Sequence, residues 1–229
     1  MLDKAAAIQS LYQTRFASSE AYRNKIWCIL CRSFFSKYIP KTAEIIDIGS
    51  GWGEFSNNIE VNKKYAMDLN PASKAHLSPD IVFINQDCSA KWPFASDTFD
   101  IVFTSNFIEH LIDKPSIERT VAEAYRCLRN GGLIICMGPN IKYVRESYWN
   151  FWDHHIPLTE ISCSELLTNA NFIIEQKIAR FLPYSMSAGF QPPIAFVEIY
   201  LKIPIIWKLL GKQFLVIGKK QPLLNNNTL

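Results

Sequence analysis

Short apolar runs, separated by stretches with helical periodicity, dominate the chain from residue 44 onward. The runs predict strands at 44–48, 65–68, 81–84, 99–103, 132–137, 172–174 and 213–217. Continuous apolar character is typical of strands that are buried on both faces of a sheet. Strands that alternate with helices predict a parallel sheet with right-handed crossovers.

Three stretches have the spacing of apolar residues expected of helices. The first lies within the first forty residues and ends at Pro40. The second opens at Pro115 and lies between the fourth and fifth strands, and the fifth strand is expected to follow a turn at Asn130 and Gly131. The third begins near Ser162 and Glu165, which have the spacing of a capping box.

The chain has 229 residues, of which 48% are hydrophobic, so one packed domain with short extensions is expected. We expect N-terminal helices over 1–40 that form a lid on the substrate side, a central domain over 41–220 and a tail over 221–229. An unusually apolar insertion, 184–212, separates the sixth and seventh strands, and Pro204 interrupts any long helix within it.

Charge and composition exclude several classes of protein. A net charge of +3 without a long basic run argues against nucleic-acid binding. The N-terminus does not resemble a signal peptide, and no apolar stretch approaches the roughly 20 residues of a membrane span, so a cytoplasmic protein is expected. Cys28 and Cys31 have metal or redox spacing, but no second pair of ligands follows them, so core packing is expected and no metal is predicted.

A glycine-rich turn follows the first strand directly, in the sequence Asp47-Ile48-Gly49-Ser50-Gly51-Trp52-Gly53. Glycines let the backbone turn sharply and let a ligand approach without a Cβ in its way. Many nucleotide-binding domains share such a turn, and some glycine turns bind nothing. The turn alone therefore predicts a ligand site without identifying the ligand.

Acidic residues at the ends of the next two strands make the prediction more specific. Asp68, followed by Leu69, ends the second strand, and a carboxylate there can accept both hydroxyls of an adenosine ribose. Asp87 and Cys88 follow the third strand, where an adenine amino group would find an acceptor. Since the carboxyl ends of parallel strands meet at one edge of the sheet, these residues are expected to converge on one crevice.

The chain resembles the class I S-adenosylmethionine-dependent methyltransferases from about Ile45 to Met137, and more loosely to its end. The resemblance rests on the glycine turn, on the two acidic positions, on the segment 99–111 and on the segment 128–132 before the fifth strand. It implies an α/β, Rossmann-like class I fold with a seven-stranded, mostly parallel sheet flanked by helices. It also implies an enzyme whose cofactor is S-adenosyl-L-methionine.

The resemblance assigns cofactor binding to residues in four turns. They are Asp47, Gly49, Ser50, Gly51, Asp68, Leu69, Asp87, Cys88, Asn106, Phe107 and His110. The pair Glu109-His110 is expected to support the cofactor pocket rather than to transfer protons. A nicotinamide dinucleotide is the competing ligand, but the turn reads Gly-x-Gly-x-Gly instead of Gly-x-Gly-x-x-Gly.

The family builds its acceptor pocket from N-terminal helices and from the segments after the fourth and fifth strands, here including 139–158. That segment carries Asp153-His154-His155 among five aromatic residues. A histidine of near-neutral pKa can deprotonate a hydroxyl, so His155, and after it His154, are the candidate bases. The other interpretation is that both histidines pack within the loop.

The C-terminal half resembles bacterial methyltransferases of surface-glycan biosynthesis, notably at 180–184 and 210–213. This looser resemblance implies O-methylation of a sugar or glycan precursor, free or carried on a lipid. A small natural product or a quinone-type acceptor remains the alternative, as does a non-catalytic subunit that only binds the cofactor. The insertion 184–212 is expected to pack on its own domain or on a second copy in a homodimer, or to contact a membrane or a lipid-linked substrate.

Overall fold

A computed structural model describes residues 20–184 and 191–221. Its centre is a seven-stranded sheet with the order β3-β2-β1-β4-β5-β7-β6. Strand β7 is antiparallel to both of its neighbours, β5 and β6, and the other adjacent pairs are parallel. The strands are β1 (Glu44–Ile48), β2 (Lys63–Asp68), β3 (Ile81–Asn85), β4 (Phe99–Ser105), β5 (Leu128–Pro139), β6 (Phe172–Ile178) and β7 (Gln213–Lys220). This is the mostly parallel, class I Rossmann-like sheet that the sequence predicts.

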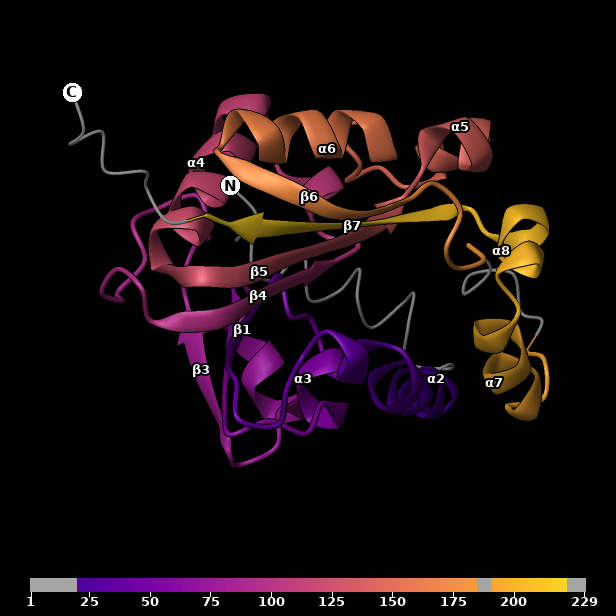
Figure 1. Cartoon of the computed structure of the whole chain (residues 1–229), viewed down its shortest axis with the longest axis horizontal. Coiled ribbons are helices and arrows are strands. Elements are labelled where there is room, and N and C mark those ends of the chain that lie inside the picture. The colour runs from indigo at the N-terminus through magenta and orange to yellow at the C-terminus, as the bar shows by residue number, and fades with distance from the viewer. Residues whose placement is uncertain (1–19, 185–190, 222–229) are drawn as a thin grey trace, which may run out of the picture.

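Helices flank the sheet on both faces (Figure 1). The α-helices are α2 (Glu20–Ser33), α3 (Glu54–Asn58), α4 (Lys114–Cys127), α5 (Ile141–Val144), α6 (Glu160–Asn169), α7 (Ala195–Lys202) and α8 (Pro204–Leu210). Short 3-10 turns are η2 (Phe35–Lys37), η3 (Pro71–His76), η4 (Ile108–His110) and η5 (Arg145–Asn150). Helices α4 and α6 lie on one side of the sheet, α2 and α3 on the other, and α7 and α8 at one end of it.

Two apolar clusters, one on each face, explain the continuous apolar runs of the strands. Ile45 and Ile46 are neighbours in β1, and both are fully buried. Ile45 packs into the cluster that includes Trp27 and other aromatic side chains of the α2 side. Ile46 packs into the opposite cluster, which includes Val121 of α4 and Leu167 of α6. Each strand residue therefore has an apolar environment, whichever face it points to.

Three local expectations need correction. Helix α6 begins two residues before Ser162, because Thr159 is its N-cap: Thr159 Oγ1 accepts a hydrogen bond from the Ser162 N–H at 3.1 Å, and Ser162 Oγ accepts one from the Thr159 N–H at 2.9 Å. The first helix ends at Ser33, and a 3-10 turn carries the chain on toward Pro40. The expected turn at Asn130 and Gly131 lies inside β5, where the pairing with β4 shifts register.

The part of the insertion that the structure describes contains two short helices, α7 and α8. They are separate helices because the chain breaks before Pro204, where the sequence predicts an interruption, and Pro204 opens α8. One face of the insertion packs on its own domain. The Tyr200 hydroxyl donates to the main-chain oxygen of Phe181 at 2.6 Å, and the Trp207 ring contacts the rings of Phe181 and Phe34. Among the residues described, no helix is long and apolar enough to span a membrane. Residues 185–190 of the insertion, 1–19 of the expected lid and 222–229 of the expected tail lie outside the described residues.

Candidate functional site

A cavity of about 350 Å³ opens at the carboxyl ends of β1, β2 and β4, where the sequence predicts the ligand site. Every predicted cofactor residue lines it, and so do both candidate bases. These residues are Asp47, Gly49, Ser50, Gly51, Asp68, Leu69, Asp87, Cys88, Asn106, Phe107, His110, His154 and His155. Strands that end at the same edge of the sheet bring together turns that are far apart in the sequence.

The glycine turn after β1 takes a backbone shape that only glycine adopts readily. Gly49 and Gly51 have φ angles of +67° and +54°. A Cβ on Gly49 would stand 2.1 Å from Cγ of Phe107. The turns after β1 and β4 can therefore pack this closely only because residue 49 has no side chain. The hydroxyl oxygen of Ser50 is buried in this turn and has no hydrogen-bond partner among the described residues, so it is available to a polar ligand.

Asp68 at the end of β2 holds the glycine turn and faces the cavity. Its Oδ2 accepts a hydrogen bond from the Gly51 N–H at 2.8 Å, and its Oδ1 accepts one from the Asn70 N–H at 2.8 Å. Burial raises the pKa of this carboxyl group above its usual value, while the two N–H donors act in the opposite direction. A carboxylate has about four acceptor positions, so two remain for the two hydroxyls of a ribose.

The floor of the cavity contains a second, more deeply buried acid. Asp47 is 3% exposed, and its Oδ2 accepts a hydrogen bond from the Ser56 hydroxyl at 2.8 Å. Burial raises the pKa of Asp47 to about 7; the hydrogen bond from Ser56 opposes this, and the nearby charge of Asp68 adds to it. Asp47 therefore lies where a cation or a hydrogen-bond donor would relieve its charge.

The turn after β4 contributes a second unsatisfied acceptor. Asn106 has a φ of +49°, a conformation that asparagine tolerates better than most residues, and its N–H donates to the Met137 main-chain oxygen at 2.8 Å. Its side-chain Oδ1 is buried and has no partner among the described residues. Gln213, the first residue of β7, likewise lines the cavity with an unsatisfied buried Oε1. These two amide oxygens could accept hydrogen bonds from the ammonium and ribose hydroxyl groups of S-adenosylmethionine, and the Ser50 hydroxyl could donate one to its carboxylate.

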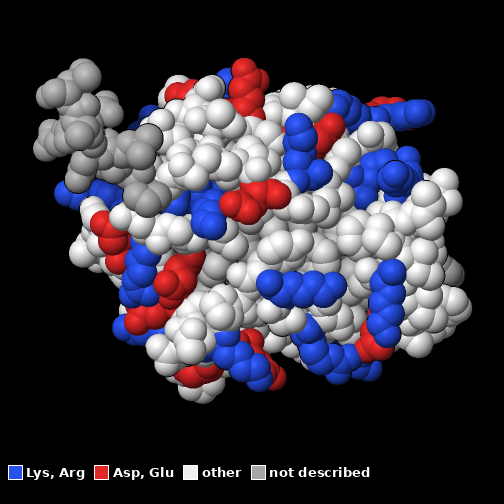
Figure 2. Space-filling view, in the orientation of Figure 1, with Lys and Arg blue, Asp and Glu red and all other residues white. Residues whose placement is uncertain are grey.

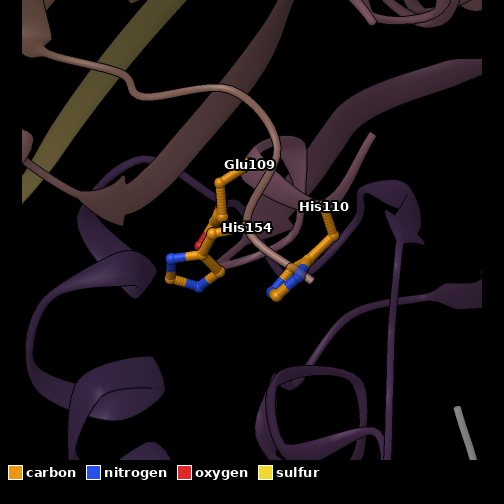
Figure 3. Close-up of side chains that lie close together, drawn as sticks. All are labelled: Glu109, His110 and His154. Atoms are coloured by element: carbon orange, nitrogen blue, oxygen red, sulfur yellow. The ribbon is translucent and has the colours of Figure 1, made fainter. Parts of the chain in front are cut away.

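Beside this polar cradle lies a cluster of Glu109, His110 and His154 (Figure 3). Glu109 is 2% exposed, and burial raises its pKa to about 7, although the charge of His110 opposes the shift. Burial alone would lower the pKa of His110, but the hydrogen bond with Asp153 and the charge of Glu109 outweigh burial, and the pKa is raised. The cluster therefore places hydrogen-bond acceptors and donors next to the predicted cofactor residues.

The two candidate bases occupy different environments. The ring of His154 is buried, with its centroid 4.5 Å from that of Tyr148 and 5.0 Å from that of Phe151. His155 lines the cavity, but its side chain is exposed, and its N–H donates to the Glu109 main-chain oxygen at 2.8 Å. The segment after β5 is thus attached to the turn after β4.

Several cavity residues were not expected from the sequence. Arg23 and Trp27 are one helical turn apart on α2 and share the face that lines the cavity, where Arg23 forms an ion pair with Glu54 of α3. Tyr184 and Gln213 line it at the two ends of the insertion. The one available signal was the spacing on α2, because the other contacts depend on segments that meet only in the folded chain.

Residues 46–136 match the family model described as a methyltransferase domain. Over these residues the sequence is similar to that family. The matched segment contains the glycine turn, both acidic turns and the turn after β4. This domain and this fold imply an enzyme that uses S-adenosylmethionine as its methyl donor. No curated protein sequence matches the chain significantly.

Solved structures similar to the chain share its fold. A chain from the complex between the Haloferax volcanii Trm112 methyltransferase activator and a putative methyltransferase has a TM-score of 0.68 at 14% identity, over 97% of this chain and 100% of that one. A SAM-dependent methyltransferase from Archaeoglobus fulgidus has a TM-score of 0.65 at 18% identity, covering 90% and 99% of the two chains. A possible histamine N-methyltransferase from Thermotoga maritima has a TM-score of 0.65 at 17% identity, covering 93% and 95%.

Proposed function

We propose that the chain transfers the methyl group of S-adenosylmethionine to a hydroxyl group of a sugar or glycan precursor. The observation that carries this proposal is the cluster of Glu109, His110 and His154 in the same cavity as the cofactor residues. Such a cluster offers hydrogen-bond acceptors to a hydroxyl, and His155 next to it in the chain offers a proton acceptor. A flat, apolar quinone would instead need an apolar wall at this position.

The cofactor supplies a methyl group that is already activated on a sulfonium. The protein has to hold the acceptor oxygen in line behind that methyl group, at roughly 3–3.5 Å, and exclude water. The C–O bond then forms as the C–S bond breaks, and the hydroxyl proton must leave. His155, which lines the cavity and is exposed to solvent, is the proposed proton acceptor, and His154 is the second candidate.

The size of the cavity supports an acceptor that enters from outside. At about 350 Å³ the cavity lies at the lower end of the range for ligand pockets, about 300–1,000 Å³. A cofactor as large as S-adenosylmethionine fills most of such a volume. Little room would then remain for the acceptor, which suits one that enters by one end, such as the terminal sugar of a larger glycan.

The surface of α7 and α8 supports an acceptor that is carried on a lipid. Apolar side chains protrude from it into solvent: Phe196 is 59% exposed, Ile205 62% and Leu209 71%. Lys202 and Lys208 are exposed on the same two helices. In Figure 2 this end of the molecule is a largely uncharged surface with Lys and Arg side chains along it. Apolar side chains beside lysines suit contact with an anionic membrane.

Release of S-adenosylhomocysteine tests the proposed function. Purified protein and S-adenosylmethionine are incubated with a bacterial lipid-linked glycan extract, with free glycans, or with a set of phenols and quinones. We expect release with a glycan fraction and a methyl ether on a sugar in the product. Release with phenols or quinones alone would contradict the proposal.

The variant His155→Ala tests the role of that side chain. We expect it to bind S-adenosylmethionine with the affinity of the wild type and to lose most of its turnover. Near-normal turnover would remove His155 from the mechanism, and the same measurement on His154→Ala distinguishes the two histidines.

A further inference from the structure

Glu109, His110 and His154 have the chemistry and arrangement of a metal-ligand set. One carboxylate oxygen and one nitrogen from each imidazole all lie within 4.8 Å of one another. Glu109 and His110 come from η4 after β4, and His154 comes from the loop that follows η5. Figure 3 shows the two imidazole rings side by side, with the Glu109 side chain reaching toward His154. The centroids of the two rings are 4.8 Å apart.

A second set of contacts orients His110 as metal-binding histidines are usually oriented. Its Nδ1 lies 2.9 Å from the main-chain oxygen of Asp153 and 3.2 Å from the Oδ2 of the same residue. A proton on Nδ1 is therefore donated to Asp153, which leaves the lone pair of Nε2 for a ligand. A histidine that donates its other ring N–H to a carboxylate or a main-chain carbonyl is a recurrent support of metal sites.

The backbone holds the two ligand-bearing segments at a fixed separation. The main-chain oxygen of Glu109 accepts hydrogen bonds from the N–H groups of His155 at 2.8 Å and Ile156 at 3.3 Å. Tyr148 and Phe151 pack against the ring of His154. Metal bonds of about 2.0–2.2 Å place ligand atoms roughly 3–4 Å apart, so closure onto an ion needs only small side-chain rotations.

We propose that Glu109, His110 and His154 bind one divalent transition-metal ion of the zinc class, with a coordination position open to the cavity. Two imidazoles and one carboxylate are a ligand set of catalytic zinc sites, which keep a fourth position for water or substrate. Imidazole ligands disfavour magnesium and calcium, which prefer oxygen atoms. The three residues line the same cavity as the cofactor residues, so the open position faces the acceptor.

This site deepens the proposed function and rests on it for its role. A metal-bound hydroxyl loses its proton more readily than a free one, because the cation stabilises the alkoxide. The ion would hold the acceptor oxygen, and the proton would pass to His155 at the edge of the cavity. This proposal departs from the expectation of no metal that the sequence gives.

The test is zinc binding by the untagged, full-length, cofactor-free protein, measured by equilibrium dialysis and by competition with a chromophoric chelator. We expect one zinc ion per chain, no displacement by excess magnesium, and visible absorption bands of a nitrogen- and oxygen-ligated site with cobalt(II) as the probe. Glu109→Gln and His154→Ala should each weaken zinc binding at least tenfold, while circular dichroism spectra that match the wild type show that they are folded.

Cys28→Ser and His155→Ala are the matched controls, because Cys28 is the exposed cysteine of the chain and His155 adjoins the proposed ligand. Both should retain the zinc affinity of the wild type. Absence of stoichiometric zinc, or equal affinity in the wild type and in both ligand variants, would overturn the metal site. Zinc binding without methylation of any sugar would leave the metal site standing and refute the proposed function instead.

Discussion

Gly49 and Phe107, which lie in the turns after β1 and β4, approach so closely that a Cβ on Gly49 would stand 2.1 Å from Cγ of Phe107. The φ of +67° at Gly49 adds backbone strain to any substitution. We expect Gly49→Ala to displace both turns and to weaken binding of S-adenosylmethionine at least tenfold, as measured by calorimetry. The melting temperature should fall as well, because overpacking and strain together cost about 2–4 kcal/mol.

Gly131→Ala is the control for backbone strain alone. Gly131 has a φ of +82°, and a Cβ there would meet nothing within 4 Å. We expect it to lose about 1 kcal/mol of stability and to bind the cofactor normally. Equal losses of cofactor affinity in the two variants would mean that the contact with Phe107 is unimportant.

Asp68→Asn should weaken the binding of S-adenosylmethionine and S-adenosylhomocysteine by the same factor, about 10- to 100-fold. The two ligands share a ribose, and hydrogen bonds to a charged group are worth about 1.5–3 kcal/mol. Asp80→Asn is the control, since Asp80 is an exposed acid whose partner is Lys64 at 2.8 Å. A loss confined to one of the two ligands would show that Asp68 does not contact the ribose.

The stability of the cofactor-free protein should fall as the pH rises from about 4 to 7. Burial raises the pKa of Asp47 to about 7, from 3.8 in the unfolded chain, so the folded state holds its proton more tightly. Stability that is present below pH 4 is therefore lost progressively up to about pH 7. Glu109, whose pKa is also raised to about 7, contributes in the same direction.

Asp47→Asn separates the contribution of Asp47. The amide oxygen can still accept the hydrogen bond from the Ser56 hydroxyl. We therefore expect the variant to melt at a higher temperature than the wild type at pH 8, and its melting temperature to depend less on pH. The expected gain is about 1–3 kcal/mol. Thermal unfolding at pH 5.5, 6.5, 7.5 and 8 measures it, and an unchanged pH dependence would exclude Asp47 as a source. Binding of S-adenosylmethionine should weaken, since the acid lines its site.

The exposed side chains of α8 should govern binding to membranes. We expect the wild type to sediment with vesicles that contain about 30% anionic lipid, and Ile205→Asp with Leu209→Asp to abolish this. A matched pair, Ile161→Asp with Ile173→Asp, removes exposed isoleucines from α6 and β6. Vesicle binding that is absent in the wild type, or lost equally in both pairs, would contradict a membrane surface on α7 and α8.

The strands were predictable because each one has apolar neighbours on both faces. The run 44–48 coincides with β1, whose side chains pack into clusters on opposite sides of the sheet. The fifth strand was predicted too short, because the ladder with β7 extends it to Pro139 and a register shift near Gly131 extends it backward. The pairing partner of a strand, unlike its apolar character, cannot be seen in the local sequence.

The convergence of the predicted cofactor residues on one cavity was equally accessible to prediction, because these residues lie at the ends of strands. The cluster of Glu109, His110 and His154 was not, since it forms only when the loop after η5 folds back onto η4. His154 and His155 are adjacent in the chain, and no periodicity predicts which side chain points inward. The hydrogen bonds from this loop to the Glu109 main-chain oxygen decide it.

The insertion leaves the wall of the cavity at Tyr184 and rejoins it at Gln213. Its two ends are therefore fixed at the site. The strands that it joins, β6 and β7, lie toward the opposite edge of the sheet from β2 and β3, whose turns carry Asp68 and Asp87. We expect exchange of this segment with that of another methyltransferase to change the cavity wall at these two residues and to leave the turns after β1 and β2 in place. The wall of the cavity is in this sense built from two separable parts, the turns after the parallel strands and the two ends of the insertion.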